Sequence, residues 1–210
     1  MLENITCLGH SSIKIINNDQ IIYIDPYKIN NYYADADIIF ITHNHYDHYS
    51  KEDIIKIKQD STKIIITKDL LQETLDLGFI ESNIITVEPN KTYKIKNLMF
   101  QTIPAYNVNK IFHPKENNWV GYIIEINKIK YYIAGDTDIT EENQKVICDI
   151  AFLPIGGTYT MTKEEAATLA NHIKPKVVVP IHYGIIVGTK QDAIEFKNLL
   201  NSSIKCEIMY

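Results

Sequence analysis

The order of hydrophobic patterns along the chain predicts an α/β or α+β fold with a substantial antiparallel part. The first third contains short apolar runs separated by tight turns, which is typical of an antiparallel meander. The final third alternates apolar runs with stretches of helical periodicity. No linker rich in Gly, Ser or Pro divides the sequence, and only 8 of its 210 residues are glycine. We therefore expect a single domain over residues 1–210.

Each apolar run between turn-forming residues predicts a strand. The predicted strands cover residues 5–8, 13–16, 21–24, 38–41, 64–66, 84–87, 93–95, 98–103, 119–126, 129–134, 150–154, 177–179 and 204–209. Helical patterns cover residues 51–59, 69–77, 163–173 and 191–200. Ser50 followed by Asp53 resembles a capping box that begins the first helix. Pro180 is expected to end the strand before it, because proline has no N–H to donate to a ladder.

Metal-binding side chains crowd into one short segment directly after the predicted strand over residues 38–41. His43, His45, Asp47 and His48 lie within six positions, and they include three of the seven histidines of the chain. Imidazoles and carboxylates are common ligands of divalent transition metals. In an irregular loop, His43 and His45 can point to one side while Asp47 and His48 point to another side. The segment therefore predicts a site for one or two metal ions.

Two later positions repeat this placement of a donor at the end of a strand. Asp136 follows the predicted strand over residues 129–134, next to Gly135, which allows the backbone to approach a ligand closely. His182 follows the buried run over residues 177–179. A capping aspartate and a satisfied core histidine are the structural alternatives.

The motif His43-x-His45-x-Asp47-His48 resembles the signature of the metallo-β-lactamase fold superfamily of metallohydrolases. Residues 134–137 and 180–184 resemble the remaining ligand loops of that superfamily, in the expected order. The resemblance covers nearly the whole chain, and it is closest to the compact branch that includes bacterial ascorbate-6-phosphate lactonase. It implies a four-layer αββα sandwich.

The resemblance also implies which donors bind which ion, with Asp136 bridging both. The first ion would take His43, His45 and Asp136, and the second Asp47, His48, Asp136 and His182. The superfamily usually supplies a further histidine to the first ion, and this chain has Asn107 at that place. Either the amide oxygen of Asn107 binds the ion or His113 does. We favour His113 because imidazole binds borderline-soft ions better than an amide does. If neither binds, the site holds one ion or holds the first ion loosely.

Two divalent ions, zinc in preference to manganese or iron, lower the pKa of bound water to about 7 and polarise a carbonyl or phosphoryl oxygen. We therefore expect a metal-dependent hydrolase in which a metal-bridging hydroxide cleaves an ester, lactone, amide or phosphodiester bond in a small, anionic substrate. Asp47 is also expected to steer a proton to the leaving group.

Other candidate site residues rest on weaker signals. Asp25 at a strand end can accept an imidazole N–H and so fix the tautomer of a ligand. His10 resembles a family feature near the metal centre, with a satisfied buried histidine as the alternative. Tyr106 and Tyr183 flank ligand loops and can donate to an oxyanion. Chance is a rival explanation for both, because the chain contains 14 tyrosines.

Composition narrows the range of partners and locations. A net charge of -5 argues against a nucleic-acid surface. All 21 basic residues are lysine, so an anionic substrate must be held by metal, lysine, hydroxyl or backbone N–H groups rather than by a guanidinium. The three cysteines show no C-x-x-C spacing. No apolar run is long enough to span a membrane, and the first residues do not resemble a signal peptide, so we expect a cytoplasmic protein.

Two alternative functions stay open on the sequence. A phosphodiesterase or nuclease would use the same ions, although such enzymes usually have a basic exosite or an added domain. A metal-binding sensor without turnover is kept open by Asn107. The oligomeric state, monomer or homo-oligomer, is also open.

Overall fold

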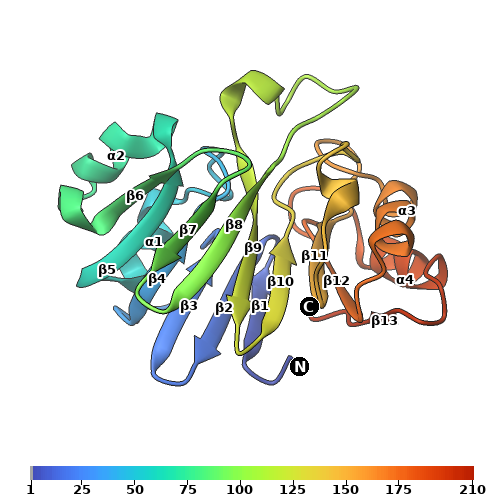
Figure 1. Ribbon diagram of the computed structural model, residues 1–210, viewed down its shortest axis with the longest axis horizontal. Coiled ribbons are helices and arrows are strands. Elements are labelled where there is room, and N and C mark those ends of the chain that lie inside the picture. Colours follow the sequence, from blue (N-terminus) through green and yellow to red (C-terminus); the bar gives the residue numbers. More distant parts are fainter. Residues whose placement is uncertain (1) are drawn as a thin grey trace. The chain divides into compact units, whose positions relative to one another are not determined.

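The computed structural model describes residues 2–210; Met1, the first residue of the predicted domain, lies outside the described residues. The chain divides into two compact units, the first extending to Glu88 and including Tyr210, the second covering Pro89–Met209. Each unit contains one β-sheet (Figure 1). The predicted mixed α/β fold with a large antiparallel part is confirmed.

The sheet of the first unit has six strands that lie side by side in chain order. The strands are β1 (Ile5–Gly9), β2 (Ser12–Asn17), β3 (Gln20–Ile24), β4 (Ala36–Phe40), β5 (Lys58–Thr67) and β6 (Ile84–Val87). The first three are antiparallel, as the meander pattern predicts, and β3 to β6 are parallel. The carboxyl ends of β3 and β4 therefore meet at one edge of the sheet, where Asp25 and the ligand segment follow them.

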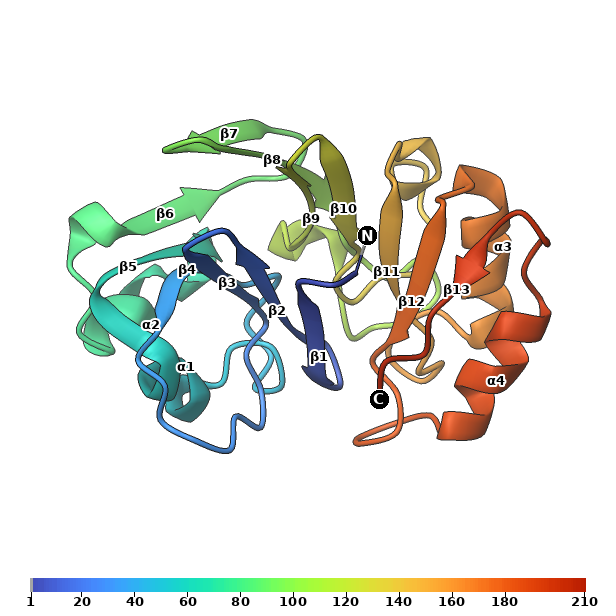
Figure 2. The same cartoon turned by 90° about the horizontal axis from the view of Figure 1, so that it is seen from below.

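Helices α1 (Lys51–Ile57) and α2 (Leu71–Asp76) cover one face of this sheet (Figure 2), with short 3-10 turns η1 (Lys68–Leu70) and η2 (Glu81–Asn83) nearby. The side chain of Ser50 accepts the N–H of Asp53, which confirms the expected start of α1. The helix predicted to reach residue 59 ends at Ile57. The next residues pair with β4 instead, because Lys58 is the register partner of Ala36.

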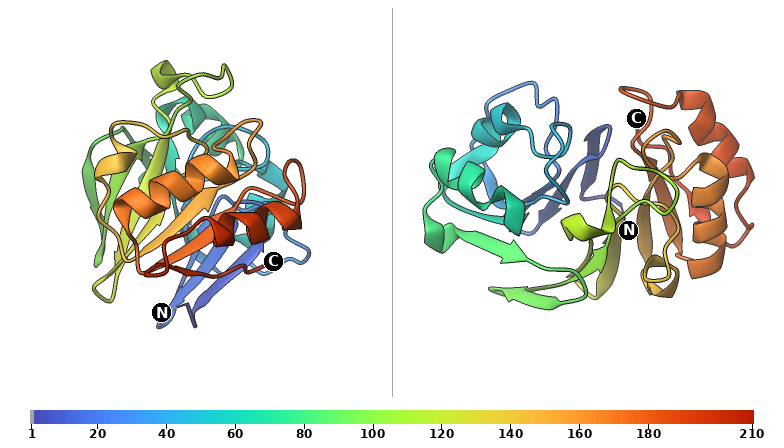
Figure 3. Two further views of the ribbon diagram at one scale, coloured as in Figure 1. Left: turned by 90° about the vertical axis from the view of Figure 1, so that its right-hand side faces the viewer. Right: turned by 90° about the horizontal axis from the view of Figure 1, so that it is seen from above.

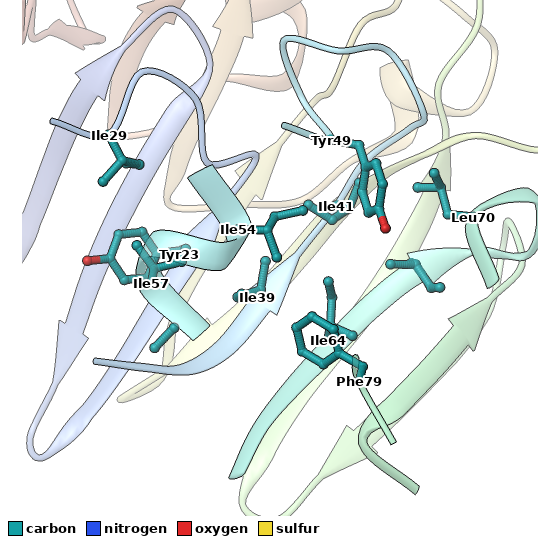
Figure 4. Packing of buried hydrophobic residues seen from close by; sticks show 12 residues of the cluster. Tyr23, Ile29, Ile39, Ile41, Tyr49, Ile54, Ile57, Ile64, Leu70 and Phe79 are labelled. Atoms are coloured by element: carbon teal, nitrogen blue, oxygen red, sulfur yellow. The ribbon is translucent and has the colours of Figure 1, made fainter. Parts of the chain in front are cut away.

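The buried face between α1 and the sheet is mainly aliphatic, and three aromatic side chains, Tyr23, Tyr49 and Phe79, join the same cluster (Figure 4). Ile39 of β4, Ile64 of β5 and Ile54 of α1 are all fully buried in one cluster. Alternate strand residues point to the same face. Burial of each such side chain contributes about 1.5–3 kcal/mol, so this packing fixes the strand whose end bears the ligand segment.

The sheet of the second unit has seven strands in the order β13-β12-β11-β10-β9-β8-β7. The strands are β7 (Thr92–Ile95), β8 (Leu98–Pro104), β9 (Val120–Ile126), β10 (Ile129–Ile133), β11 (Ile150–Pro154), β12 (Val177–Ile181) and β13 (Lys205–Cys206). β7 to β10 are antiparallel neighbours, and β10 to β13 are parallel. By this arrangement β8, β10, β11 and β12 all end at the same edge.

Helices α3 (Lys163–Ile173) and α4 (Lys190–Asn198) pack against each other beside the β11–β13 end of this sheet (Figure 3). Both begin with a capping box, formed by Thr162 with Glu165 and by Thr189 with Asp192. Two 3-10 turns, η3 (Lys115–Asn117) and η4 (Asn143–Lys145), lie in the loops. In each unit, helices thus cover one face of one sheet. None of the helices over residues 2–210 has the length and apolar composition needed to cross a membrane.

Two expectations for the last strands are wrong. β12 continues through Pro180, which pairs in register with Leu153 of β11. The nitrogen of Pro180 faces the side of β13, and β13 pairs only with Val177 and Val178, so the missing N–H interrupts no ladder there. The strand predicted over residues 204–209 is limited to Lys205–Cys206, because β13 pairs with β12 only at Val177 and Val178.

Candidate metal centre

The ligand segment of the first unit leaves β4 and turns sharply, so that its donors crowd together. The backbone N–H groups of His48 and Tyr49 both donate to the carbonyl of His45. This turn places His43 Nε2 3.1 Å from His45 Nδ1, and His48 Nε2 3.7 Å from Asp47 Oδ2. His43 and His48 are almost fully buried, and their ring centroids lie 4.0 Å apart. The structure thus brings together the four donors that the motif predicts.

Asp25 supports this segment from the end of β3. Its carboxylate accepts the backbone N–H of Thr42 at 2.8 Å and the Thr42 hydroxyl at 2.7 Å, and it lies 2.7 Å from His48 Nδ1. A carboxylate accepts here, so the His48 proton belongs on Nδ1 and the lone pair on Nε2. The Thr42 hydroxyl, having donated to Asp25, accepts from His43 Nδ1 at 2.9 Å and leaves His43 Nε2 as the basic atom.

His10 belongs to the same group of side chains in the first unit. It is fully buried, and its Nε2 lies 2.9 Å from Asp47 Oδ2. Donor atoms of His10, Asp47 and His48 all lie within 4.8 Å of one another. The hydroxyl of Tyr210 donates to the carbonyl of His10 at 2.6 Å, and His10 has a left-handed backbone, with φ of 53°. His10 is therefore a buried histidine that contacts a ligand candidate, and its role in the site stays a prediction.

Three donors also converge within the second unit, at the edge where its parallel strands end. Asp136 follows β10 and His182 follows β12, and His182 Nε2 lies 3.0 Å from Asp136 Oδ2. His113, from the loop after β8, places its Nε2 3.3 Å from the same oxygen. All three side chains are at most 3% exposed. Asp136 is therefore the shared neighbour of both histidines.

Close backbone packing holds His182 in this position. A Cβ on Gly156, in the loop after β11, would lie 2.6 Å from the carbonyl oxygen of His182 and 3.0 Å from its Nδ1. Only glycine therefore fits against His182 without displacing it. His182 itself has a left-handed backbone, with φ of 58°.

The separations between donors fit a small cation in each unit. Ligand atoms bound tetrahedrally at 2.0–2.1 Å lie about 3.3 Å from one another. The His43–His45, His113–Asp136 and His182–Asp136 contacts are 3.1, 3.3 and 3.0 Å. Buried imidazole and carboxylate donors at these distances suit zinc and related divalent metals.

Asn107 lies beside His113 and makes several hydrogen bonds. Its Oδ1 accepts the backbone N–H of His113 at 3.1 Å and lies 3.1 Å from His113 Nδ1. Its Nδ2 donates to the carbonyl of Tyr159 at 2.9 Å. Of the two residues that the sequence offers to complete the first metal site, His113 is the one that contacts Asp136.

The two tyrosines named from the sequence differ in their surroundings. The hydroxyl of Tyr106 donates to Glu142 at 2.8 Å, and Lys115 lies 3.2 Å from that hydroxyl and 3.0 Å from Glu142. Burial and the hydrogen bond to Glu142 raise the pKa of Tyr106. Tyr183 is fully buried directly after His182. The catalytic roles of both stay predictions.

The sequence does not single out Thr42, Tyr210 or Gly156, although each contacts a candidate site residue. Thr42 precedes His43 directly, which is a usable signal, because a hydroxyl beside a ligand often orients it. Tyr210 and Gly156 give no local signal. Burial raises the pKa of Cys7 to about 12. Burial thus disfavours the thiolate form of Cys7.

Comparison with known proteins identifies the family of this arrangement. The model of the beta-lactamase superfamily domain matches residues 4–182. The chain belongs to the metallo-β-lactamase superfamily. A UPF0173 metal-dependent hydrolase of Thermococcus onnurineus is 31% identical over 218 residues, which covers 96% of this chain and 94% of the relative.

Solved structures agree with this membership of the metallo-β-lactamase superfamily. A Parabacteroides distasonis protein described as a metal-dependent hydrolase superimposes with a TM-score of 0.85 at 32% identity, covering 97% of this chain and 91% of that one. Igni18, a metallo hydrolase of Ignicoccus hospitalis, gives a TM-score of 0.80 at 26% identity over 98% and 94% of the two chains. The chain is therefore a metal-dependent hydrolase, as the motif predicts.

Proposed function

We propose that this superfamily member holds two divalent ions, zinc in preference to manganese or iron, and hydrolyses a small, anionic molecule at an ester, lactone, amide or phosphodiester bond. Two observations support it: His113, Asp136 and His182 converge in one unit, and the other unit contains a complete ligand motif. A cytoplasmic location and the absence of a nucleic-acid partner remain part of this proposal.

The donors are assigned to the ions by the superfamily pattern. By that pattern the first ion would take His43, His45, His113 and Asp136, and the second would take Asp47, His48, Asp136 and His182. The ions would supply an activated water and a Lewis acid for the scissile bond. The chain itself supplies imidazoles whose protons are already placed, as Asp25 and Thr42 show for His48 and His43.

Proton transfer falls to Asp47 and His10. The 2.9 Å contact between His10 Nε2 and Asp47 Oδ2 shares one proton between an imidazole and a carboxylate. Asp47 can accept the proton that the attacking water loses and pass it to the leaving group, while His10, buried and anchored by Tyr210, keeps the carboxylate in place. Tyr106 and Tyr183 remain candidates for donating to the oxyanion.

The cations near the second-unit ligand loops do not provide an alternative anion site. Lys110 pairs with Asp138, and Lys115 pairs with Glu142. Since the chain has no arginine, an anionic substrate group would bind to metal, another lysine, hydroxyl or backbone N–H groups.

Metal analysis and an activity screen test the proposal together. Protein purified without added ions is expected to contain about two transition-metal ions per chain, and to hydrolyse generic lactone or phosphodiester substrates. His48→Ala is expected to lose metal and at least about 100-fold in rate, more than the usual effect of an outer contact. Full metal content without hydrolysis of any ester, lactone, amide or phosphodiester would support the sensor alternative instead. Metal-free protein with unchanged activity in His48→Ala would overturn the metal mechanism.

A further inference from the structure

We infer that Asn107 is a positioning residue, which fixes the ring of His113 so that Nε2 is the atom that binds metal. The inference rests on the proposed function, because it assigns a role within the same centre. In this chain, Asn107 would orient a metal ligand from a position where the superfamily usually has a ligating histidine.

Two backbone groups fix the orientation of the Asn107 amide. The N–H of His113 lies 3.1 Å from Oδ1, and the carbonyl of Tyr159 lies 2.9 Å from Nδ2. A backbone N–H can only donate and a carbonyl can only accept. Rotating the amide by 180° would set Nδ2, a donor, against the N–H of His113, and Oδ1, an acceptor, against the carbonyl of Tyr159. The oxygen of Asn107 must therefore face His113.

The amide orientation in turn fixes the tautomer of His113. Its Nδ1 lies 3.1 Å from Oδ1 of Asn107, which can only accept, so Nδ1 carries the proton. A neutral imidazole protonated at Nδ1 has its lone pair on Nε2. That atom lies 3.3 Å from Asp136 Oδ2, a separation typical of two ligands of one ion.

The same hydrogen bonds prevent Asn107 from acting as a ligand. An amide oxygen has two lone pairs, and the backbone and ring N–H groups of His113 use both. A further hydrogen bond, from the N–H of Asn107 to the carbonyl of His113 at 2.8 Å, closes the loop between the two residues. Asn107 is only 7% exposed, so these partners do not exchange readily with water.

Two substitutions separate positioning from general structure. Asn107→Ala removes the acceptor, so we expect metal affinity to fall about 10–100-fold, the usual effect of losing an outer partner of a histidine ligand. Asn107→Asp keeps the acceptor for Nδ1 but sets a carboxylate oxygen against the Tyr159 carbonyl. We expect it to keep metal affinity within about 5-fold of the wild type, which is below the range for losing the partner, while lowering the melting temperature.

Asn83 provides a matched control in the other unit. It is also 7% exposed, accepts from Lys63 at 2.7 Å and donates to the carbonyl of Asp60 at 2.8 Å. Asn83→Ala should therefore lower the melting temperature without changing metal affinity.

The experiment measures zinc affinity by chelator competition for the wild type and the three variants, and records ¹⁵N NMR of the histidine rings in metal-free protein. The expected result is a His113 ring protonated at Nδ1 in wild type and Asn107→Asp, and no longer fixed in that tautomer in Asn107→Ala. Wild-type affinity in Asn107→Ala, or a wild-type His113 protonated at Nε2, would overturn the inference and leave the proposed function standing. A wild type that binds no metal would overturn the proposed function instead.

Discussion

The two units reach the same chemical end, an imidazole with its lone pair on Nε2, by different means. In the first unit, the donors are close in sequence, and a side-chain carboxylate, Asp25, orients His48. In the second unit, the donors come from separate loops, and main-chain groups act through Asn107 to orient His113. A carboxylate adds charge to the centre, whereas an amide held by the backbone adds none. The comparison indicates that ligand geometry and local charge can be set independently.

Loss of Asp136 should have the largest effect, because this carboxylate contacts both histidines of the second unit. In Asp136→Ala we expect metal content to fall by at least one ion per chain and hydrolysis to fall more than about 100-fold, beyond the range for an outer contact. Asp53→Ala is the matched control. Asp53 is similarly buried, but its carboxylate accepts from the backbone N–H groups of Lys28 and Ile29 and from the side chains of Ser50 and Lys56, none of which is a ligand candidate. A metal loss of the same size in both variants would show that burial, not ligation, is responsible.

Asp25→Ala tests the side-chain support of the first unit. We expect metal affinity to fall about 10–100-fold. We also expect stability to fall by about 1–3 kcal/mol, because the backbone N–H of Thr42 loses its buried acceptor. Zinc titration and chemical denaturation measure the two effects. Equal metal affinities in Asp25→Ala and wild type would mean that only the second unit depends on an outer partner.

Gly156→Ala tests the backbone support of the second unit. The added Cβ would press on the carbonyl of His182, so we expect about 1–3 kcal/mol of destabilisation from overpacking and weaker metal binding. Gly78→Ala is the control: its φ of 81° strains the backbone, but the nearest atom to the new Cβ is Lys58 Nζ, at 3.8 Å. Metal binding should weaken in the first variant and stay unchanged in the second. Identical metal affinities would remove the role given to Gly156.

Asp149 should have the smallest effect, because it lies at the opposite edge of the second sheet from the ligand loops. It accepts the N–H of Lys130 and pairs with Lys176, and these interactions lower its pKa. A lowered pKa in the folded state stabilises the fold above the pKa of the unfolded chain. That contribution is lost as the pH falls through the folded-state pKa.

Asp149→Asn is therefore expected to destabilise the protein by about 1 kcal/mol at pH 7. The difference in stability between Asp149→Asn and wild type should shrink below pH 4. The substitution should leave metal affinity unchanged. Thermal unfolding from pH 7 to pH 3 measures it, and a difference that is constant over this range would contradict the carboxylate assignment.

The same contrast explains what the sequence could predict. The ligand motif of the first unit is contiguous, so its four donors could be named from spacing alone, and the strands around it follow hydrophobic periodicity. The sequence narrowed the further ligand of the first ion to His113 or Asn107 and favoured His113. The contacts that support this choice, with Tyr159 and Asp136, join residues that are distant in the chain. The predicted end of α1 and the predicted length of β13 were wrong, because strand pairing, a non-local interaction, determines both.

Three candidate residues, His10, Asp25 and His182, have φ between 45° and 58°, a region that L-amino acids occupy at a cost of about 1–3 kcal/mol each. Glycine would relieve that cost at all three places while deleting an imidazole or a carboxylate. Directed evolution that selected for thermal stability alone would therefore enrich inactive variants. Selection schemes for this enzyme need a metal-dependent readout from their first round.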